Sequence, residues 1–216
     1  MTAASAIEPD GTPATDGPPQ TFDAGSLPDV VFGARNLASW ATVGFMLIEG
    51  TTLVIALTAY LYVRRNFPEW PPPPTPLPDL LIPTLNTIVL LLVIVPMVLA
   101  AHAARAFDVR SMRRALLVAT ALSAVNVALR FFELDALNTR WDSHAYGSVA
   151  WLAVGLHSTL LLVDFIESAT ITALTFSRNL QRKHFSDVED AAFYQYFLSL
   201  SWLPVYGLVY WGPRWL

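Results

Sequence analysis

The chain has 216 residues, of which 54% are hydrophobic and only 14% charged, and its mean hydropathy is +0.46. Soluble domains carry about 25% charged residues, so this composition indicates a protein embedded in a membrane. The sequence contains no cysteine, which excludes disulfide scaffolds, iron–sulfur clusters and thiolate zinc sites in this chain. Its formal net charge is −4 and Lys183 is its only lysine, which argues against a nucleic-acid-binding protein.

The first 30 residues differ in composition from the rest of the chain. They are rich in Pro, Gly, Thr and Ala and carry five acidic residues. They lack the basic region and apolar core of a signal peptide. We expect residues 1–30 to form a disordered tail and residues 31–216 to form the membrane domain.

Five apolar segments follow the tail, and a transmembrane helix needs about 20 mostly apolar residues. The segments are residues 37–63, 80–101, 115–132, 146–176 and 191–211. The third and fourth contain ionisable residues, which are stable in a membrane only where they face protein. We predict an all-α integral membrane bundle of five transmembrane helices; with only four, the third segment would lie at the membrane surface.

Arginine and lysine residues near the span ends predict the orientation, because they accumulate on the cytoplasmic side. With five spans, one side carries Arg35, Arg105, Arg110, Arg113, Arg114, Arg178, Arg182 and Lys183, and the other Arg64, Arg65, Arg140 and Arg214. The N-terminus is therefore expected in the cytoplasm and the C-terminus outside.

Aromatic and proline residues mark the predicted span ends. Tryptophans there are typical of anchors at the membrane interface; they are Trp40, Trp70, Trp141, Trp151, Trp211 and Trp215. Residues 70–74, WPPPP, predict a stiff polyproline loop on the outer face.

The first and third spans contain acidic or basic residues whose placement is costly in lipid. Glu49 lies in the middle of the first span, where it is protonated or paired; we expect either a proton relay or subunit contact, or a neutral carboxyl bonded locally. Arg130 and Glu133 on the third span are three residues apart and so share one face. This spacing predicts a local ion pair, with contact to a lipid headgroup as the alternative.

The fourth span carries a polar sector that predicts packing against other protein. His157, Asp164, Ser158 and Ser168 fall within this sector at a period of 3.6 residues. Asp164 and Glu167 lie about 27 and 32 Å along the helix from its start, at about 1.5 Å per residue. We expect this pair near the cytoplasmic boundary, either solvated or functional.

The sequence predicts no catalytic centre and no metal site in this chain. Its four histidines are expected at different depths, and none forms a paired metal-binding motif. Neither a nucleophile elbow nor a Walker loop is present. Any redox chemistry that the chain serves is therefore expected to belong to a partner.

Six short motifs occur in order along the five spans. They are GFMLIE at 44–49, WPP at 70–72, PTLNT at 83–87, FFE at 131–133, YGS and GLH at 146–148 and 155–157, and an aromatic series within 194–211. Together they resemble subunit III of the haem–copper oxidases, in its short five-helix bacterial form. The resemblance covers about residues 36–213 and carries over to Glu49, His157 and Glu133.

The sequence departs from this family pattern at four positions. Leu160 stands where the family usually has a second histidine, and on the last span Gln195, Tyr196 and Ser199 replace Trp, His and Asp. These replacements indicate a divergent branch, so no lipid or proton role is carried over to the last helix.

The resemblance implies a non-catalytic, cofactor-free subunit of a bacterial terminal oxidase in aerobic electron transport. Such a subunit packs against subunit I, with subunit II and a larger respiratory supercomplex as further partners, supports proton uptake and binds phospholipid, here through His157 and Arg130. Haem and copper are then expected in the partner subunits, and the chain in the bacterial inner membrane.

Several alternatives stay open on the sequence. A quinol oxidase or a nitric oxide reductase uses a similar subunit, and cytochrome c oxidase is favoured by its frequency in the family. A small channel or transporter would use Glu49, Arg130, His157 and Asp164 as a polar path, although the chain lacks the internal repeat of many transporters. A membrane scaffold or assembly factor is the remaining alternative.

Overall fold

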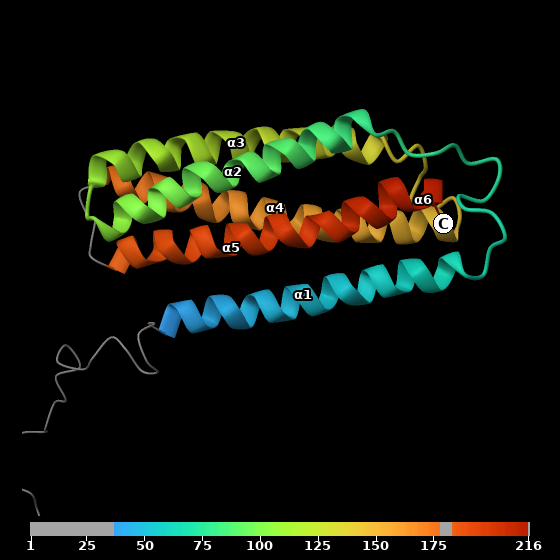
Figure 1. Ribbon diagram of the computed structural model, residues 1–216, viewed down its shortest axis with the longest axis horizontal. Coiled ribbons are helices and arrows are strands. Elements are labelled where there is room, and N and C mark those ends of the chain that lie inside the picture. The colour runs from blue at the N-terminus through green and yellow to red at the C-terminus, as the bar shows by residue number, and fades with distance from the viewer. Residues whose placement is uncertain (1–36, 178–182, 216) are drawn as a thin grey trace, which may run out of the picture. The chain divides into compact units, whose positions relative to one another are not determined.

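The computed structural model describes residues 37–177 and 183–215, which form long helices joined by short connections (Figure 1). The helices are α1 (Leu37–Arg64), α2 (Leu81–Arg105), α3 (Val109–Asp135), α4 (Ala145–Phe176) and α5 (Lys183–Tyr206). A π-helical turn (Gly207–Trp211) and the short α6 (Gly212–Trp215) extend α5. The described residues contain no β-strand, which confirms the all-α prediction. The predicted tail lies outside the described residues.

Four of these helices, α1 to α4, are long and apolar enough to cross a membrane. The third predicted segment is one of them, so it does not have to lie at the membrane surface. The fifth helix begins at Lys183, eight residues before the predicted span. His184 therefore lies in this helix.

The helices run alternately up and down, so the bundle has two distinct ends (Figure 1). We call the end that holds the α2–α3 connection the basic end, because Arg105, Arg110 and Arg114 lie there. The other end holds the loop with residues 70–74, and we call it the proline-loop end. Helices α1, α3 and α5 start at the basic end, whereas α2 and α4 finish there.

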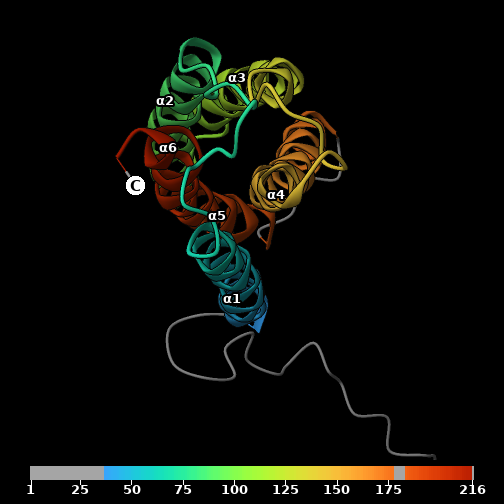
Figure 2. The same cartoon turned by 90° about the vertical axis from the view of Figure 1, so that its right-hand side faces the viewer.

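Small residues let the helices approach one another near the basic end. A buried cluster there consists largely of alanines on α2, α3 and α5, together with Met97, Met112 and Leu116. Close approach through small side chains is the common packing mode of membrane helices. Figure 2 shows α2 to α5 arranged about a common axis, with α1 on the α5 side of this group.

A second buried cluster, near the proline-loop end, is aromatic. Trp70 donates a hydrogen bond from Nε1 to the Tyr60 hydroxyl at 2.8 Å, and the centre of its ring lies 4.8 Å from that of Tyr146 in an edge-to-face arrangement. The Trp70 side chain is buried, so its expected role as an anchor at the membrane interface is wrong. It instead fastens the proline loop to α1 and α4, while Trp40, Trp141 and Trp215 are exposed as anchors require.

The start of α4 is fixed by a side-chain cap and a close backbone approach. His144 Nδ1 accepts a hydrogen bond from the Gly147 amide at 3.1 Å, so Nε2 carries the proton and donates to Thr75 Oγ1 at 2.7 Å. A Cβ atom at Gly147 would lie 2.2 Å from the Arg140 carbonyl oxygen. The α3–α4 connection therefore passes α4 at a point where only glycine fits.

Candidate functional site

The strongest polar feature inside the bundle is an ion pair on α3. Arg130 Nη1 lies 2.9 Å from Glu133 Oε2, and both side chains are almost completely buried. This is the local ion pair predicted from the spacing of three residues. Its burial could not be predicted from spacing, because it depends on the helices that cover α3.

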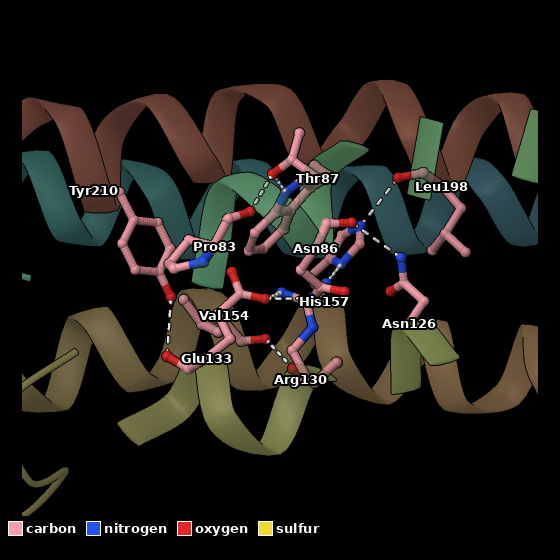
Figure 3. Close-up of polar contacts among 12 residues, drawn as sticks. Pro83, Asn86, Thr87, Asn126, Arg130, Glu133, Val154, His157, Leu198 and Tyr210 are labelled. Carbon is pink, nitrogen blue, oxygen red and sulfur yellow. Dashed lines mark hydrogen bonds and ion pairs between the residues drawn. The ribbon is translucent and has the colours of Figure 1, made fainter. Parts of the chain in front are cut away.

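Helix α2 supplies the second partner of this ion pair. Asn86 Nδ2 donates to Glu133 Oε2, and Asn126 Nδ2 donates to the Asn86 carbonyl oxygen at 3.2 Å (Figure 3). The Tyr210 hydroxyl donates to the Glu133 carbonyl oxygen at 3.4 Å. Glu133 thus has a cation and an amide on one carboxylate oxygen, which offsets much of the cost of burying its charge.

Helices α4 and α5 close the other side of Arg130. His157 Nε2 lies 3.0 Å from the Leu198 carbonyl oxygen and therefore carries the ring proton, which leaves Nδ1 to accept from Arg130 Nη2 at 3.4 Å. The Arg130 guanidinium carbon lies 4.0 Å from the centre of the Trp202 ring, within the range of a cation–π interaction. The Trp202 indole donates to Thr87 Oγ1 at 2.8 Å.

We call these residues the paired cluster: Asn86, Thr87, Asn126, Arg130, Glu133, His157, Trp202 and Tyr210. Asn86, His157 and Trp202 each lie nineteen residues from the basic end of their helix, which is about 28 Å at about 1.5 Å per residue. These three residues therefore lie at one depth, and the cluster occupies the half of the bundle nearer the proline loop.

The paired cluster retains spare hydrogen-bonding capacity. Asn86 Oδ1, Asn126 Oδ1, Glu133 Oε1 and Arg130 Nε are buried without a hydrogen-bond partner in the described part of the chain. Buried polar atoms that converge in this way are suited to bind internal water. The arrangement can hold charge and water inside a membrane, but its charged groups are bonded to one another and not presented to a substrate.

A second group of polar residues lies nearer the basic end, and we call it the acidic cluster: Glu49, Asp164 and Tyr194. The Tyr194 hydroxyl donates to Glu49 Oε2 at 2.7 Å, which joins α5 to α1. Asp164 on α4 is 1% exposed, and its Oδ2 has no hydrogen-bond partner among the described residues. Of the two alternatives predicted for this pair, solvation is therefore wrong for Asp164, whereas Glu167 is exposed.

The structure separates the predicted site residues into these two clusters. Arg130, Glu133 and His157 meet in the paired cluster, and Glu49 and Asp164 belong to the acidic cluster. Sequence reasoning did not assign Asn86, Asn126, Tyr194 or Trp202 to a site. The amides in apolar spans were the available signal for Asn86 and Asn126, because buried amides need partners.

A small groove on the outside of the bundle lies beside the paired cluster. It has a volume of about 190 Å³ between α3 and α4. Apolar side chains, Ser158, Thr159 and part of Arg130 line it. His157 is completely buried, so of the two residues predicted to bind lipid only Arg130 borders this groove, and the lipid role itself stays a prediction.

The described residues hold no group of three or more His, Asp or Glu side chains that could bind a metal ion. The family model for cytochrome c oxidase subunit III matches residues 66–214, which is more than half of the chain. The chain belongs to the cytochrome c oxidase subunit III family.

Individual members of the family show the same relationship. The chain is 33% identical over 144 residues to cytochrome c oxidase subunit 3 of Strongylocentrotus purpuratus, covering 66% of this chain and 55% of that protein. It is 28% identical over 183 residues to the Synechocystis protein of the same name, covering 82% and 77%. The human protein is 31% identical over 148 residues, covering 66% and 55%. The chain thus spans about half the length of its animal relatives.

Membership of the subunit III family and the four apolar helices both indicate that the chain is a multi-pass membrane protein. The match begins after α1 and includes every residue of the paired cluster. Glu49 lies before the matched region, so its assignment to the family's membrane glutamate stays a prediction.

Proposed function

We propose that the chain is a non-catalytic, cofactor-free subunit of a bacterial haem–copper terminal oxidase, and that this oxidase is a cytochrome c oxidase, as the names of the relatives support. It stabilises the catalytic subunit I and supports proton uptake by that subunit, in the inner membrane with the basic end in the cytoplasm. Haem and copper belong to its partners, subunits I and II.

The observation that carries this proposal is that the ionisable side chains inside the membrane bundle are buried. Arg130, Glu133, His157, Asp164 and Glu49 are all buried within the bundle. A channel or transporter needs ionisable groups that reach water along a path. Arg130, Glu133 and His157 are also bonded to one another, which favours a supporting subunit over the polar-path alternative.

Helix α1 supplies a surface that supports contact with another membrane subunit. It touches α5 along one face, where Gly50 lies against the Phe197 ring and Glu49 accepts from Tyr194. Its other faces present large apolar side chains such as Leu47 and Ile55. In a membrane such faces meet either lipid or the apolar helices of a partner.

Affinity purification of the tagged full chain from membranes in mild detergent tests the proposal. We expect two larger subunits to co-purify and the eluate to show haem bands in a reduced-minus-oxidised spectrum. A colourless eluate that is stable without partners would overturn the proposal. A conductance measured with the chain alone in liposomes would favour the channel instead.

Two variants of Glu49 test its place within the assembly. Glu49→Gln keeps the shape and the bond from Tyr194, so the complex should form with normal yield. Glu49→Lys places an ammonium group beside α5 in the membrane, where it is costly, and should reduce the yield strongly. An unchanged yield of Glu49→Lys would contradict a buried Glu49.

A further inference from the structure

Asp164 stands apart from the other buried charged groups because, among the described residues, no cationic side chain forms an ion pair with it and no donor reaches its Oδ2. It is 1% exposed, and its Oδ2 has no hydrogen-bond partner in the described ranges. Burying an ionised carboxylate without a partner costs several kcal/mol or more, and such a group takes up a proton instead. Glu133, by contrast, has Arg130 and Asn86.

The groups around Asp164 add negative charge. The charges of Glu49 on α1 and Glu167 on α4 act on it, and those of Asp187 and Asp190 on α5 act on Glu167. The Tyr194 hydroxyl lies in the field of the same carboxylates. In the described part of the chain, no cationic side chain forms an ion pair with Asp164 or Glu49.

Three helices bring the acidic cluster to one depth. Glu49 is twelve residues from the start of α1, Asp164 twelve from the end of α4, and Tyr194 eleven from the start of α5. All three therefore lie about 17–18 Å from the basic end, at about 1.5 Å per residue. The charge of Glu49 acts on Asp164, and two carboxyl groups that interact in this way do not both ionise readily.

The hydrogen bond from Tyr194 makes the two carboxyl groups different. Its hydroxyl hydrogen is already donated to Glu49 Oε2, so Glu49 is the carboxylate with a donor. Asp164 is the more deeply buried of the two, 1% against 7% exposed, and lacks a donor at Oδ2. Asp164 is therefore the member that is neutral.

Glu167 links this position to the basic end. It is three residues beyond Asp164 on α4 and so lies on the same side of the helix, and it is exposed. We propose that Asp164 binds a proton that it exchanges with the basic end through Glu167, and that Glu49 and Tyr194 complete this proton-binding site. The link from this site to an oxidase rests on the proposed function, but the site itself does not.

Infrared spectroscopy of the full-length chain in lipid discs tests this site directly. A protonated carboxyl group gives a carbonyl band that shifts when hydrogen is exchanged for deuterium. We expect this band in the wild type, its loss in Asp164→Asn and its retention in Glu49→Gln. Asp135→Asn is the control, because Asp135 is exposed at the proline-loop end, and it should leave the band unchanged.

The rate of the deuterium shift tests whether the proton exchanges through Glu167. Glu167→Gln should slow the deuterium shift of the band several-fold without removing the band. Exchange at the wild-type rate in this variant would overturn the assignment of Glu167.

Isotope labelling keeps the test decisive if Asp164→Asn does not accumulate. Carbon-13 in the carboxyl groups of aspartate should move the wild-type band, and the same label in glutamate should not. A band that follows the glutamate label, or that disappears in Glu49→Gln, would overturn the proposal, as would the absence of any band. These infrared outcomes test the proton-binding site alone. A colourless eluate in the affinity purification tests only whether the chain is a subunit of an oxidase.

Discussion

The paired cluster and the acidic cluster are both polar and both buried, but they differ in how their charge is compensated. In the paired cluster Glu133 has Arg130 at 2.9 Å and an amide donor from α2. In the acidic cluster Glu49 accepts from the Tyr194 hydroxyl, Asp164 has no donor at Oδ2, and no cation among the described residues pairs with either carboxyl group. Charge inside a membrane bundle is thus handled in two ways, by pairing near the proline loop and, as we propose, by protonation nearer the basic end.

The largest effect is expected from removing the cation of the paired cluster. Arg130→Met leaves Glu133 buried without its counter-ion, and breaking a buried pair on one side costs about 3–5 kcal/mol. The free energy of unfolding, measured in mixed micelles, should fall by this amount. Arg114→Met, at an exposed arginine on the same helix, is the control and should change it little.

The double variant Arg130→Met/Glu133→Leu sharpens this prediction. It removes both charges, so no unpaired ion remains in the bundle. We expect it to be more stable than Arg130→Met alone. If the two single losses simply add in the double variant, the side chains do not act as a pair.

A smaller effect is expected where the α3–α4 connection passes α4. Gly147→Ala places a Cβ 2.2 Å from the Arg140 carbonyl oxygen, and overpacking of this kind costs about 1–3 kcal/mol. Gly155→Ala on the same helix meets nothing within 4 Å and is the matched control. Equal stability of the two variants, measured by thermal unfolding, would contradict the close approach at Gly147.

Loss of one hydrogen bond in the paired cluster should have a still smaller effect. Trp202→Phe keeps an aromatic ring beside Arg130 but removes the indole donor to Thr87. The expected loss in the free energy of unfolding is about 1 kcal/mol. Trp141→Phe, at an exposed tryptophan, should show no such loss in the same assay.

The smallest effect is a pH dependence at the exposed start of α3. The Ser111 hydroxyl and the amides of Ser111 and Arg110 donate to Asp108, and these bonds lower the pKa of its carboxyl group. Asp108 therefore stabilises α3 above the pKa of an ordinary aspartate, about 3.9, and this contribution is lost as the pH falls below that value through the lowered pKa. Hydrogen exchange at the first turn of α3 should rise in that range, whereas Asp108→Asn should show no such dependence.

The sequence was sufficient for the helical bundle because apolar segments of about 20 residues leave few alternatives in a membrane. It was also sufficient for the Arg130–Glu133 contact, which depends only on neighbouring turns of one helix. The contacts of Asn86 with Glu133 and of Tyr194 with Glu49 join distant segments. They depend on helix rotation and depth, which spacing along one helix does not specify. The same limit explains why the sequence leaves Asp164 either solvated or functional.

The most direct test of this comparison replaces each buried carboxyl group by its amide. Glu133→Gln and Asp164→Asn are matched in shape, and their free energies of unfolding can be measured side by side in the same lipid. We predict that Glu133→Gln loses several kcal/mol, because Arg130 is left without its counter-ion, while Asp164→Asn loses much less, because the native group is already neutral. Equal losses, or a larger loss for Asp164→Asn, would contradict the distinction between the two clusters.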